Sequence, residues 1–371
     1  MAAEFRVFLN DEPAEEQTLN LFSQVRVDQA MGMAWEAELH MPVGLDDNGN
    51  WSGIDEAFAQ PLARVRVEAQ VGEGEFVPLI DGPVVGQRFE LSGSPNRSNL
   101  VLVVHDDSVK LNRDETVQVF EDMAASDIAS NLFSDSGLFS IVDNVDKPAG
   151  DLGRYIVQRG TPMALLRELA RRHGMWVYVR PGDAAGKAGV GVFQRPSLGE
   201  PDLPEILIVG AQRNCNQFSA RFDALRPATA RADSVGIMDV GQRTQEAEDS
   251  VLKSLGDKAA HELVEPGRTL LARTRETDDD LGNATQAAVD HSAWAYTAHG
   301  EVRAGTYGGV MAPYQTVNVA GAGGYLGGTY LISQVTHNLD DSGYRQQFVL
   351  RRNARADATG SGASSIPGGI F

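Results

Sequence analysis

The side chains that could carry out catalysis are few in this chain and are not spaced for it. His261-Glu262 resembles the start of the zinc-protease pattern His-Glu-x-x-His, but Glu265 stands where the second histidine ligand is needed. Neither a Gly-x-Ser-x-Gly nucleophile motif nor a Gly-x-x-x-x-Gly-Lys phosphate loop occurs. His105 and His337 lie in predicted strands without a spaced serine or cysteine partner, so we expect packed or hydrogen-bonded side chains. The sequence therefore predicts no catalytic residues.

Three segments resemble ligand-binding loops and fail on spacing. Asp46–Asn50 starts like a calcium loop, but Trp51 occupies the glycine position and Ala57 the position of the bidentate glutamate. Asp278–Asp280 offers neighbouring carboxylates without spaced oxygen ligands, which is typical of a solvated loop. In Gly321–Gly328 the third glycine comes one place late for a dinucleotide loop, and both flanks have the pattern of strands. We expect no metal and no cofactor.

Composition excludes further classes of function. The net charge is −19, from 51 acidic and 32 basic side chains, which disfavours binding to nucleic acid or to anionic lipid. Cys215 is the only cysteine, so an internal disulfide is impossible and a buried, inert thiol is expected. The start of the chain lacks the pattern of a secretory signal, and no apolar run approaches the ~20 residues of a membrane helix. These features predict assembly in a reducing cytoplasm without membrane insertion.

The elements that position these residues are mostly strands. A chain of 371 residues is expected to form two to four domains. Up to about residue 105, apolar and polar residues alternate, and turn formers such as Asp81-Gly82-Pro83 separate the runs. The predicted strands of this part are Ala34–Met41, Ala63–Ala69, Phe76–Ile80, Val84–Leu91 and Asn99–Val104. This spacing favours a β-barrel or sandwich.

A mixed α/β segment follows. One helix is predicted through Ile128 to Phe133, ending before Gly137. The second has Thr161 as N-cap, Pro162 at its first position and Gly174 at its end, with an apolar stripe over Leu165–Leu169. Strands are predicted over Arg154–Gln158 and Met175–Val179. Trp176 and Tyr178 alternate in the latter strand and are expected to pack on the Leu165–Leu169 stripe.

The rest of the chain returns to strands around a charged segment. Strands are predicted over Ile206–Val209, Gln217–Phe222 and from Glu301 onward, and helices over Glu246–Leu255 and Ala284–Ala298. From Ala354 to Gly369 the composition is rich in Ala, Gly and Ser, which predicts a flexible tail.

A weak internal repeat links the two β-rich parts. Gly82–Leu91 and Gly328–His337 each begin a strand after glycine, cross a polar turn and enter a second strand, Leu100–Val104 or Gln346–Leu350. Any two hairpins share this plan, so the repeat is consistent with duplication without requiring it.

Several segments resemble one protein family. Tyr330–His337, a polar turn and Gly343–Arg351 resemble the closing hairpin of phage late control D proteins and VgrG-like hubs. Three upstream segments resemble the same proteins: His105–Ser108 with Leu111–Arg113, Phe120–Leu132 and Gly160–Ala170. The order and spacing hold over roughly residues 70–352.

The resemblance implies a fold and a domain plan. The fold class is α+β, mainly β, with two similar β-barrel domains, an α/β insert and a helical insert. The expected parts are a first barrel over 1–105, a small α/β domain over 106–204, a second barrel over 205–240 plus 300–353, a helical insert over 241–299 and a flexible C-terminal tail over 354–371.

The same resemblance implies a structural function. It predicts a non-enzymatic hub subunit that forms a homotrimeric ring between a hexameric inner tube and a trimeric spike in a contractile injection machine. The partners would be two further copies, an inner tube protein, a separate spike protein and other baseplate or tape-measure proteins, because no spike domain follows residue 352. Two alternatives stay open: a peptidoglycan-degrading tail enzyme, which needs paired carboxylates in a cleft, and a receptor-binding β module with an exposed aromatic patch.

Overall fold

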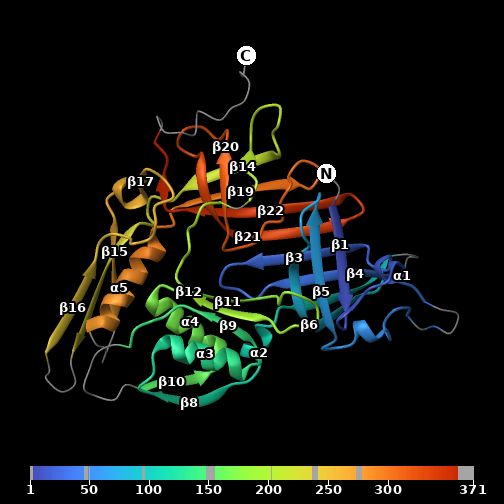
Figure 1. The fold of residues 1–371 in the computed structure, drawn as a ribbon, viewed down its shortest axis with the longest axis horizontal. Coiled ribbons are helices and arrows are strands. Elements are labelled where there is room, and N and C mark those ends of the chain that lie inside the picture. The colour runs from blue at the N-terminus through green and yellow to red at the C-terminus, as the bar shows by residue number, and fades with distance from the viewer. Residues whose placement is uncertain are drawn as a thin grey trace.

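The computed structural model describes residues 3–45, 49, 51–93, 97–147, 155–201, 203–235, 241–272 and 278–357. Strands dominate these residues; helices α2, α3 and α4 gather in one small layer, α5 lies at one side, and the short α1 lies at the opposite side (Figure 1). The α+β, mainly β fold class is therefore confirmed. The division into domains by residue range stays a prediction.

The N-terminal part is a curled antiparallel sheet around its own core. Its elements are β1 (Ala3–Leu9), β2 (Glu12–Pro13), α1 (Glu16–Leu19), β3 (Gln24–Ala30), β4 (Glu36–Val43), η1 (Ala57–Ala59), β5 (Arg64–Val71), β6 (Val77–Glu90) and β7 (Ser98–His105). Alternation explains these strands, because every second residue of β4, from Ala37 to Val43, is buried while the others face outward. The Asp46–Asn50 loop lies outside the described residues apart from Gly49.

One strand replaces two predicted ones. β6 runs without a break through Asp81-Gly82-Pro83, which the sequence predicts to be a turn. Asp81 is buried because Arg64 and Arg66 bind its carboxylate, so its polarity does not mark a solvated turn. Gly82 is required for packing, since a Cβ there would lie 1.8 Å from the carbonyl oxygen of His105.

The α/β layer follows its predicted elements closely. It contains α2 (Val109–Asn112), β8 (Thr116–Glu121), α3 (Ala125–Asp135), β9 (Phe139–Val142), β10 (Tyr155–Gly160), α4 (Pro162–His173), β11 (Trp176–Arg180) and β12 (Val190–Gln194). The hydroxyl of Thr161 accepts the N–H of Ala164 at 3.2 Å, and Gly174 adopts the left-handed conformation that ends α4. Both helices lie where the sequence predicts them.

The C-terminal part builds the second curled sheet and a side unit. Its elements are β13 (Ile206–Leu207), β14 (Cys215–Phe222), β15 (Ala228–Val235), β16 (Gln242–Ala247), β17 (Lys258–Ala259), η2 (Ala260–Glu262), β18 (Gly267–Ala272), α5 (Asp278–Ser292), β19 (Tyr296–Arg303), β20 (Thr316–Ala320), β21 (Gly328–Asp340), β22 (Gly343–Arg352) and β23 (Ala354–Arg355). β15, β16 and β18 form a separate small sheet against which α5 packs.

Three predictions about this part are wrong. The helix over Glu246–Leu255 does not form, because its first two residues belong to β16, which pairs with β15, and residues 248–255 form neither helix nor strand. Asp278–Asp280 is the start of α5 and not a connecting loop, which places the carboxylates of Asp279 and Asp280 in the first turn, at the positive end of the helix dipole. Ala354–Arg355 pairs with β17, so the predicted tail begins with a strand, and residues 358–371 lie outside the described range.

The two curled sheets form one continuous sheet with a repeated order of strands. The path runs β14-β19-β22-β21 and then β3-β4-β7-β6, with antiparallel pairing at every step. The path thus consists of two sets of four strands, here called quartets, and the second quartet repeats the order of the first. β3 corresponds to β14, β4 to β19, β7 to β22 and β6 to β21. The hairpins β6–β7 and β21–β22 are the pair that the weak internal repeat predicts (Figure 1).

Candidate functional site

The junction between the quartets is a buried hydrogen-bond chain. β21 pairs with β3 from Gln334 to Asp340, and His337, fully buried, lies in the middle of this pairing. Its Nδ1 is 2.7 Å from the hydroxyl of Tyr344, and its Nε2 is 3.2 Å from Oε1 of Gln29. The Gln29 oxygen can only accept, so Nε2 carries the proton and Nδ1 accepts from Tyr344. The Gln29 amide in turn donates to the carbonyl of Leu79 at 2.6 Å.

Burial sets the charge of this histidine. Burial lowers the pKa of His337 to about 3, against a smaller opposing effect of Asp28. The imidazole is therefore neutral at physiological pH, and each of its nitrogens has a partner. His337 is a structural residue that joins the two curled sheets, as the sequence predicts for a packed histidine.

β21 changes its partner at a bulge. Up to Leu331 it pairs with β20 on one side, and from Gln334 it pairs with β3, with Ser333 as the extra residue opposite β22. β6 is built in the same way, with a bulge at Val85 between Val84 and Gly86. Its first half pairs with β5, but the second half, Gly86–Glu90, has no strand on its outer side among the described residues. β14, at the other end of the path, also leaves one edge unpaired within the described chain.

Apolar side chains are exposed at the unpaired edge of β6. The strand pairings superimpose Phe89 and Leu91 on His337 and Leu339. The latter two are buried where β3 covers them, whereas Phe89 is 44% and Leu91 52% exposed. Sequence reasoning missed this site, because the internal repeat marks the two hairpins but not the difference in exposure between their edges.

The α/β layer is tied to both curled sheets through Tyr314. The Tyr314 ring stacks on Tyr178 at 3.8 Å between centroids and lies 5.2 Å from Trp176, and its hydroxyl accepts the N–H of Gly32 at 2.9 Å. The prediction that Trp176 and Tyr178 pack on the α4 stripe is wrong. Val177 and Val179 face that stripe instead, because alternate residues of a strand point to opposite faces.

A buried ionic cluster joins the first curled sheet to the α/β layer. Arg64 contacts Asp81 at 2.8 Å and Asp107 at 3.0 Å, and Arg66 contacts Asp81 at 2.9 Å and the carbonyl of Gly182 at 2.7 Å. Both aspartates have 1% or less of their side chain exposed. Carboxylates that are held by arginines and closed to solvent serve as structural anchors and are not placed to meet a substrate.

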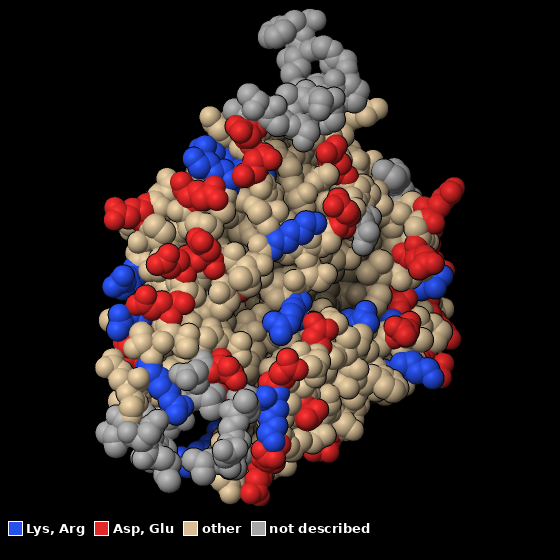
Figure 2. All heavy atoms as spheres, turned by 60° about the vertical axis from the view of Figure 1, so that its left-hand side comes forward, with Lys and Arg blue, Asp and Glu red and all other residues tan. Residues whose placement is uncertain are grey.

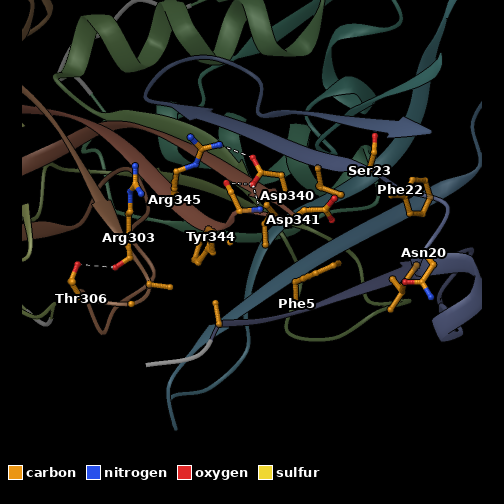
Figure 3. A pocket seen from close by; sticks show the side chains of 18 of the residues that line it. Phe5, Asn20, Phe22, Ser23, Arg303, Thr306, Asp340, Asp341, Tyr344 and Arg345 are labelled. Carbon is orange, nitrogen blue, oxygen red and sulfur yellow. Dashed lines mark hydrogen bonds and ion pairs between the residues drawn. The ribbon is translucent and has the colours of Figure 1, made fainter. Parts of the chain in front are cut away.

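A cavity lies between the N-terminal strands and the tip of the β21–β22 hairpin, and Figure 3 shows side chains that line it. Its volume is about 770 Å³. Phe5 and Phe22 line one side, and Asp340, Asp341 and Arg345 come from the hairpin. Asp340 binds Arg345 at 2.6 Å and accepts from the hydroxyl of Ser342. Hydrogen bonding to Ser342, with help from Arg345, lowers the pKa of Asp340. A carboxylate held in its charged form is a poor general acid, so Asp340 is not suited to protonate the leaving group in glycoside hydrolysis.

The other residues singled out by sequence lie apart from one another. His105 lies 2.9 Å from Glu36 across β4 and β7, and His261 lies 3.2 Å from Asp249. Cys215 is buried, and burial raises the pKa of its thiol, so it is an inert core residue. Gly321–Gly328 connects β20 to β21, and several of its glycines have positive φ, as a turn requires.

The described residues offer neither a metal-binding cluster nor a membrane-spanning helix. They contain no group of three or more His, Cys, Asp or Glu side chains placed to hold a metal ion. They contain no helix long and apolar enough to cross a membrane.

Comparisons with known proteins give matches in structure and none in sequence. No family model and no curated protein matches the chain. A 43 kDa tail protein of prophage MuSo2 from Shewanella oneidensis has a TM-score of 0.63 at 17% identity, covering 95% of this chain and 99% of that one. A tail protein from Neisseria meningitidis has a TM-score of 0.66 at 12% identity, with 95% and 97% coverage.

A third similar structure comes from a secretion system. It is an E. coli component of the type VI secretion system, described as structurally similar to the T4 bacteriophage tail proteins gp27 and gp5. Its TM-score is 0.56 at 10% identity, covering 99% of this chain and 80% of that one. These likenesses extend over nearly the whole chain and confirm the resemblance inferred from the hairpin and helix motifs. The chain therefore has the fold of phage tail proteins and of VgrG-like components of injection machines.

Proposed function

We propose that three copies of this protein form a ring that joins a hexameric inner tube to a trimeric spike at the baseplate of a contractile injection machine, assembled in the bacterial cytoplasm. The observation that carries the proposal is the repeated strand order. One quartet follows the other in a single sheet, joined by β21 and β3. A third quartet, supplied by the next copy, can continue the sheet in the same way.

The internal junction serves as a template for the junction between copies. In it, the second half of β21 pairs antiparallel with β3. By correspondence, the second half of β6 would pair with β14 of the next copy. When the residue pairs of β21 and β3 are applied to the corresponding residues of β6 and β14, Phe89 lies opposite Ala220 of that neighbour. Leu91 then lies opposite its Phe218. Such pairing would bury the exposed apolar side chains of the β6 edge and satisfy its free backbone groups.

The number of four-strand quartets in each copy explains how three copies could close into a ring. Each copy supplies two, so three copies present six similar faces with only threefold true symmetry. That geometry suits a hexameric tube on one side and a trimeric spike on the other. The similar structures, which include phage tail proteins and a type VI secretion component, support a structural role in such an assembly.

The test is a disulfide between copies. In a Cys215→Ser background, Phe89→Cys and Ala220→Cys are combined in one chain and oxidised. We expect a covalent trimer on a non-reducing gel, whereas each single substitution should give no ladder beyond a dimer. Leu62→Cys with Leu225→Cys, both exposed in the single chain, is the matched control and should stay monomeric. Failure of the Phe89/Ala220 pair to crosslink, with a monomer by light scattering, would exclude the ring.

A cell-wall degrading enzyme is the competing function, and it predicts loss of turbidity when the pure protein is added to a peptidoglycan suspension. The burial of Asp81 and Asp107 behind arginines favours the structural role. We therefore expect no change in turbidity.

A further inference from the structure

A second large cavity lies where α4, α5 and the segment before β15 meet. Its volume is about 770 Å³, within the range of ligand pockets. Much of its wall is apolar and includes Met175, Trp176, Leu252 and Trp294. Leu225 lies at its rim and is 94% exposed, which is unusual for a leucine in a folded chain. Figure 2 brings this side of the molecule forward and shows basic side chains around a hollow on a face where acidic side chains are more numerous.

Basic side chains from three different elements line the same cavity. Arg171 comes from the last turn of α4, Arg226 from the connection between β14 and β15, and His291 from the last turn of α5. Neither arginine forms an ion pair with a carboxylate in the described part of the chain. The Nε of Arg226 is buried without a hydrogen-bond partner there, which is costly for a charged group.

The carboxylate that lines this cavity is already occupied. Oδ1 of Asp290 accepts from the hydroxyl of Ser250 at 2.8 Å, from the N–H of Val251 at 2.9 Å and from the amide of Gln286 at 3.1 Å. Asp290 thus fixes the segment that follows β16 onto α5. The carboxylate keeps its charge, but it makes no ion pair with either arginine in the described part of the chain.

The local field is positive although the protein as a whole is acidic. Burial, followed by the charges of Arg226, Arg351 and Arg171, lowers the pKa of His291. Two guanidinium groups, those of Arg171 and Arg226, line the cavity together with the carboxylate of Asp290. Two arginines that form no ion pair in the described part of the chain therefore face a cavity whose wall is largely apolar.

We propose that this cavity binds an acidic peptide segment of a partner protein, with a carboxylate against Arg171 and Arg226 and an apolar side chain against Leu225 and Trp294. Guanidinium groups bind carboxylates through paired hydrogen bonds, which suits Arg171 and Arg226 to a carboxylate ligand. The apolar wall favours a peptide over a free phosphate. The net charge of −19 disfavours nucleic acid. The proposal concerns the outside of one copy and does not depend on ring formation.

Fluorescence anisotropy of the full chain tests this with defined probes. The binding probe is a labelled ten-residue peptide of alternating glutamate and leucine with one central phenylalanine. The comparison probes replace glutamate by lysine, or leucine by serine. We expect the first peptide to bind, and Arg226→Gln or Arg171→Gln to weaken it by about tenfold each, since each removes a charge-assisted contact. Arg226→Lys should recover part of the loss, and Leu225→Ser should weaken binding without changing the charge.

Arg159→Gln is the matched control, because it removes the same charge from an exposed position on β10, away from the cavity. It should leave the affinity unchanged. Equal binding of the lysine or serine peptides, or equal loss in the Arg159 variant, would overturn the proposal. So would displacement of the peptide by millimolar phosphate alone, or binding seen only in a Phe89→Asp chain, which would identify a second copy as the occupant.

Discussion

At the scale of single residues, the buried polar groups hold the parts of the molecule together. His337 has a partner for each ring nitrogen and reaches Tyr344 and Gln29 on two other strands. Its neutral form is the one that fits, because a proton on Nδ1 would place a charge in a site without solvent. The junction of the two curled sheets is therefore expected to respond to acid.

The acid response has a definite sign. Burial depresses the pKa of His337 from 6.5 to about 3, so its contribution to stability is complete above pH 6.5 and is lost as pH falls toward 3. pH 5 lies 1.5 units below the pKa of 6.5 that the histidine has in the unfolded chain. The free energy of unfolding is therefore lower there by roughly 2 kcal/mol. Urea unfolding of wild type and His337→Gln at pH 7 and pH 5 measures it. Between pH 7 and pH 5 the variant should lose less stability than the wild type does. Equal losses would contradict the conclusion that His337 is buried in its neutral form.

Tyr314 provides a second prediction at this scale. It has φ of +71°, a conformation that costs a non-glycine residue about 1–2 kcal/mol, and its stacking on Tyr178 holds it there. Tyr314→Phe loses only the hydrogen bond from Gly32 and should cost about 1 kcal/mol. Tyr314→Ala should cost about 3–5 kcal/mol by thermal or urea unfolding. Similar costs for both variants would argue against the stacking role.

At the scale of elements, local rules predicted the helices of the α/β layer and failed where tertiary contacts decide. α4 carries its own start and stop signals, Thr161, Pro162 and Gly174, and forms where they indicate. β6 has turn residues in its middle and remains a strand, because Arg64 and Arg66 neutralise Asp81 inside the fold. The β16 segment has a polar composition that favours helix but lies beside β15, which supplies a strand partner. None of these partners is visible in the local sequence.

The same limit applies to the candidate site. The hairpin repeat could be seen in the sequence, and the structure confirms both hairpins. The edge residues Phe89 and Leu91 could not be singled out, because an exposed apolar side chain becomes informative only after its buried counterpart is known. The basic cavity draws Arg171, Arg226 and His291 from elements far apart in the chain, so no motif marks it.

Two glycines of β6 differ in their tolerance of a side chain. A Cβ on Gly82 would lie 1.8 Å from the carbonyl oxygen of His105, whereas one on Gly86 would meet Val103 at an ordinary 3.6 Å. Gly82→Ala should therefore destabilise the fold by about 3 kcal/mol or more, because backbone atoms must move apart. Gly86→Ala is the control and should change stability by less than about 1 kcal/mol. Differential scanning calorimetry distinguishes the two.

At the scale of the whole molecule, the unpaired edges at the two ends of the sheet determine what the protein can assemble into. An edge strand with exposed apolar residues pairs with another chain unless charge prevents it. The proposed ring uses both edges of each copy, which explains how an open sheet avoids endless growth.

A charge at the β6 edge should therefore prevent assembly and leave each copy folded. Phe89→Asp adds a carboxylate to a side chain already 44% exposed, so the single chain should keep its stability. Mass photometry should show trimers for wild type and monomers for the variant. Phe139→Asp, at a position 64% exposed on β9, is the control and should remain trimeric. Monomers for wild type at all concentrations would contradict the prediction.

The pairing of β21 with β3 also has a consequence for how the chain is made. Thr336 bonds to Asp28, a partner synthesised 308 residues earlier. At translation rates of roughly 5–20 residues per second, β3 waits roughly 15–60 s on the ribosome before its neighbour emerges. During that time the nascent N-terminal sheet presents an open edge to every other nascent copy nearby, so premature pairing between unfinished chains is the main hazard in producing this protein.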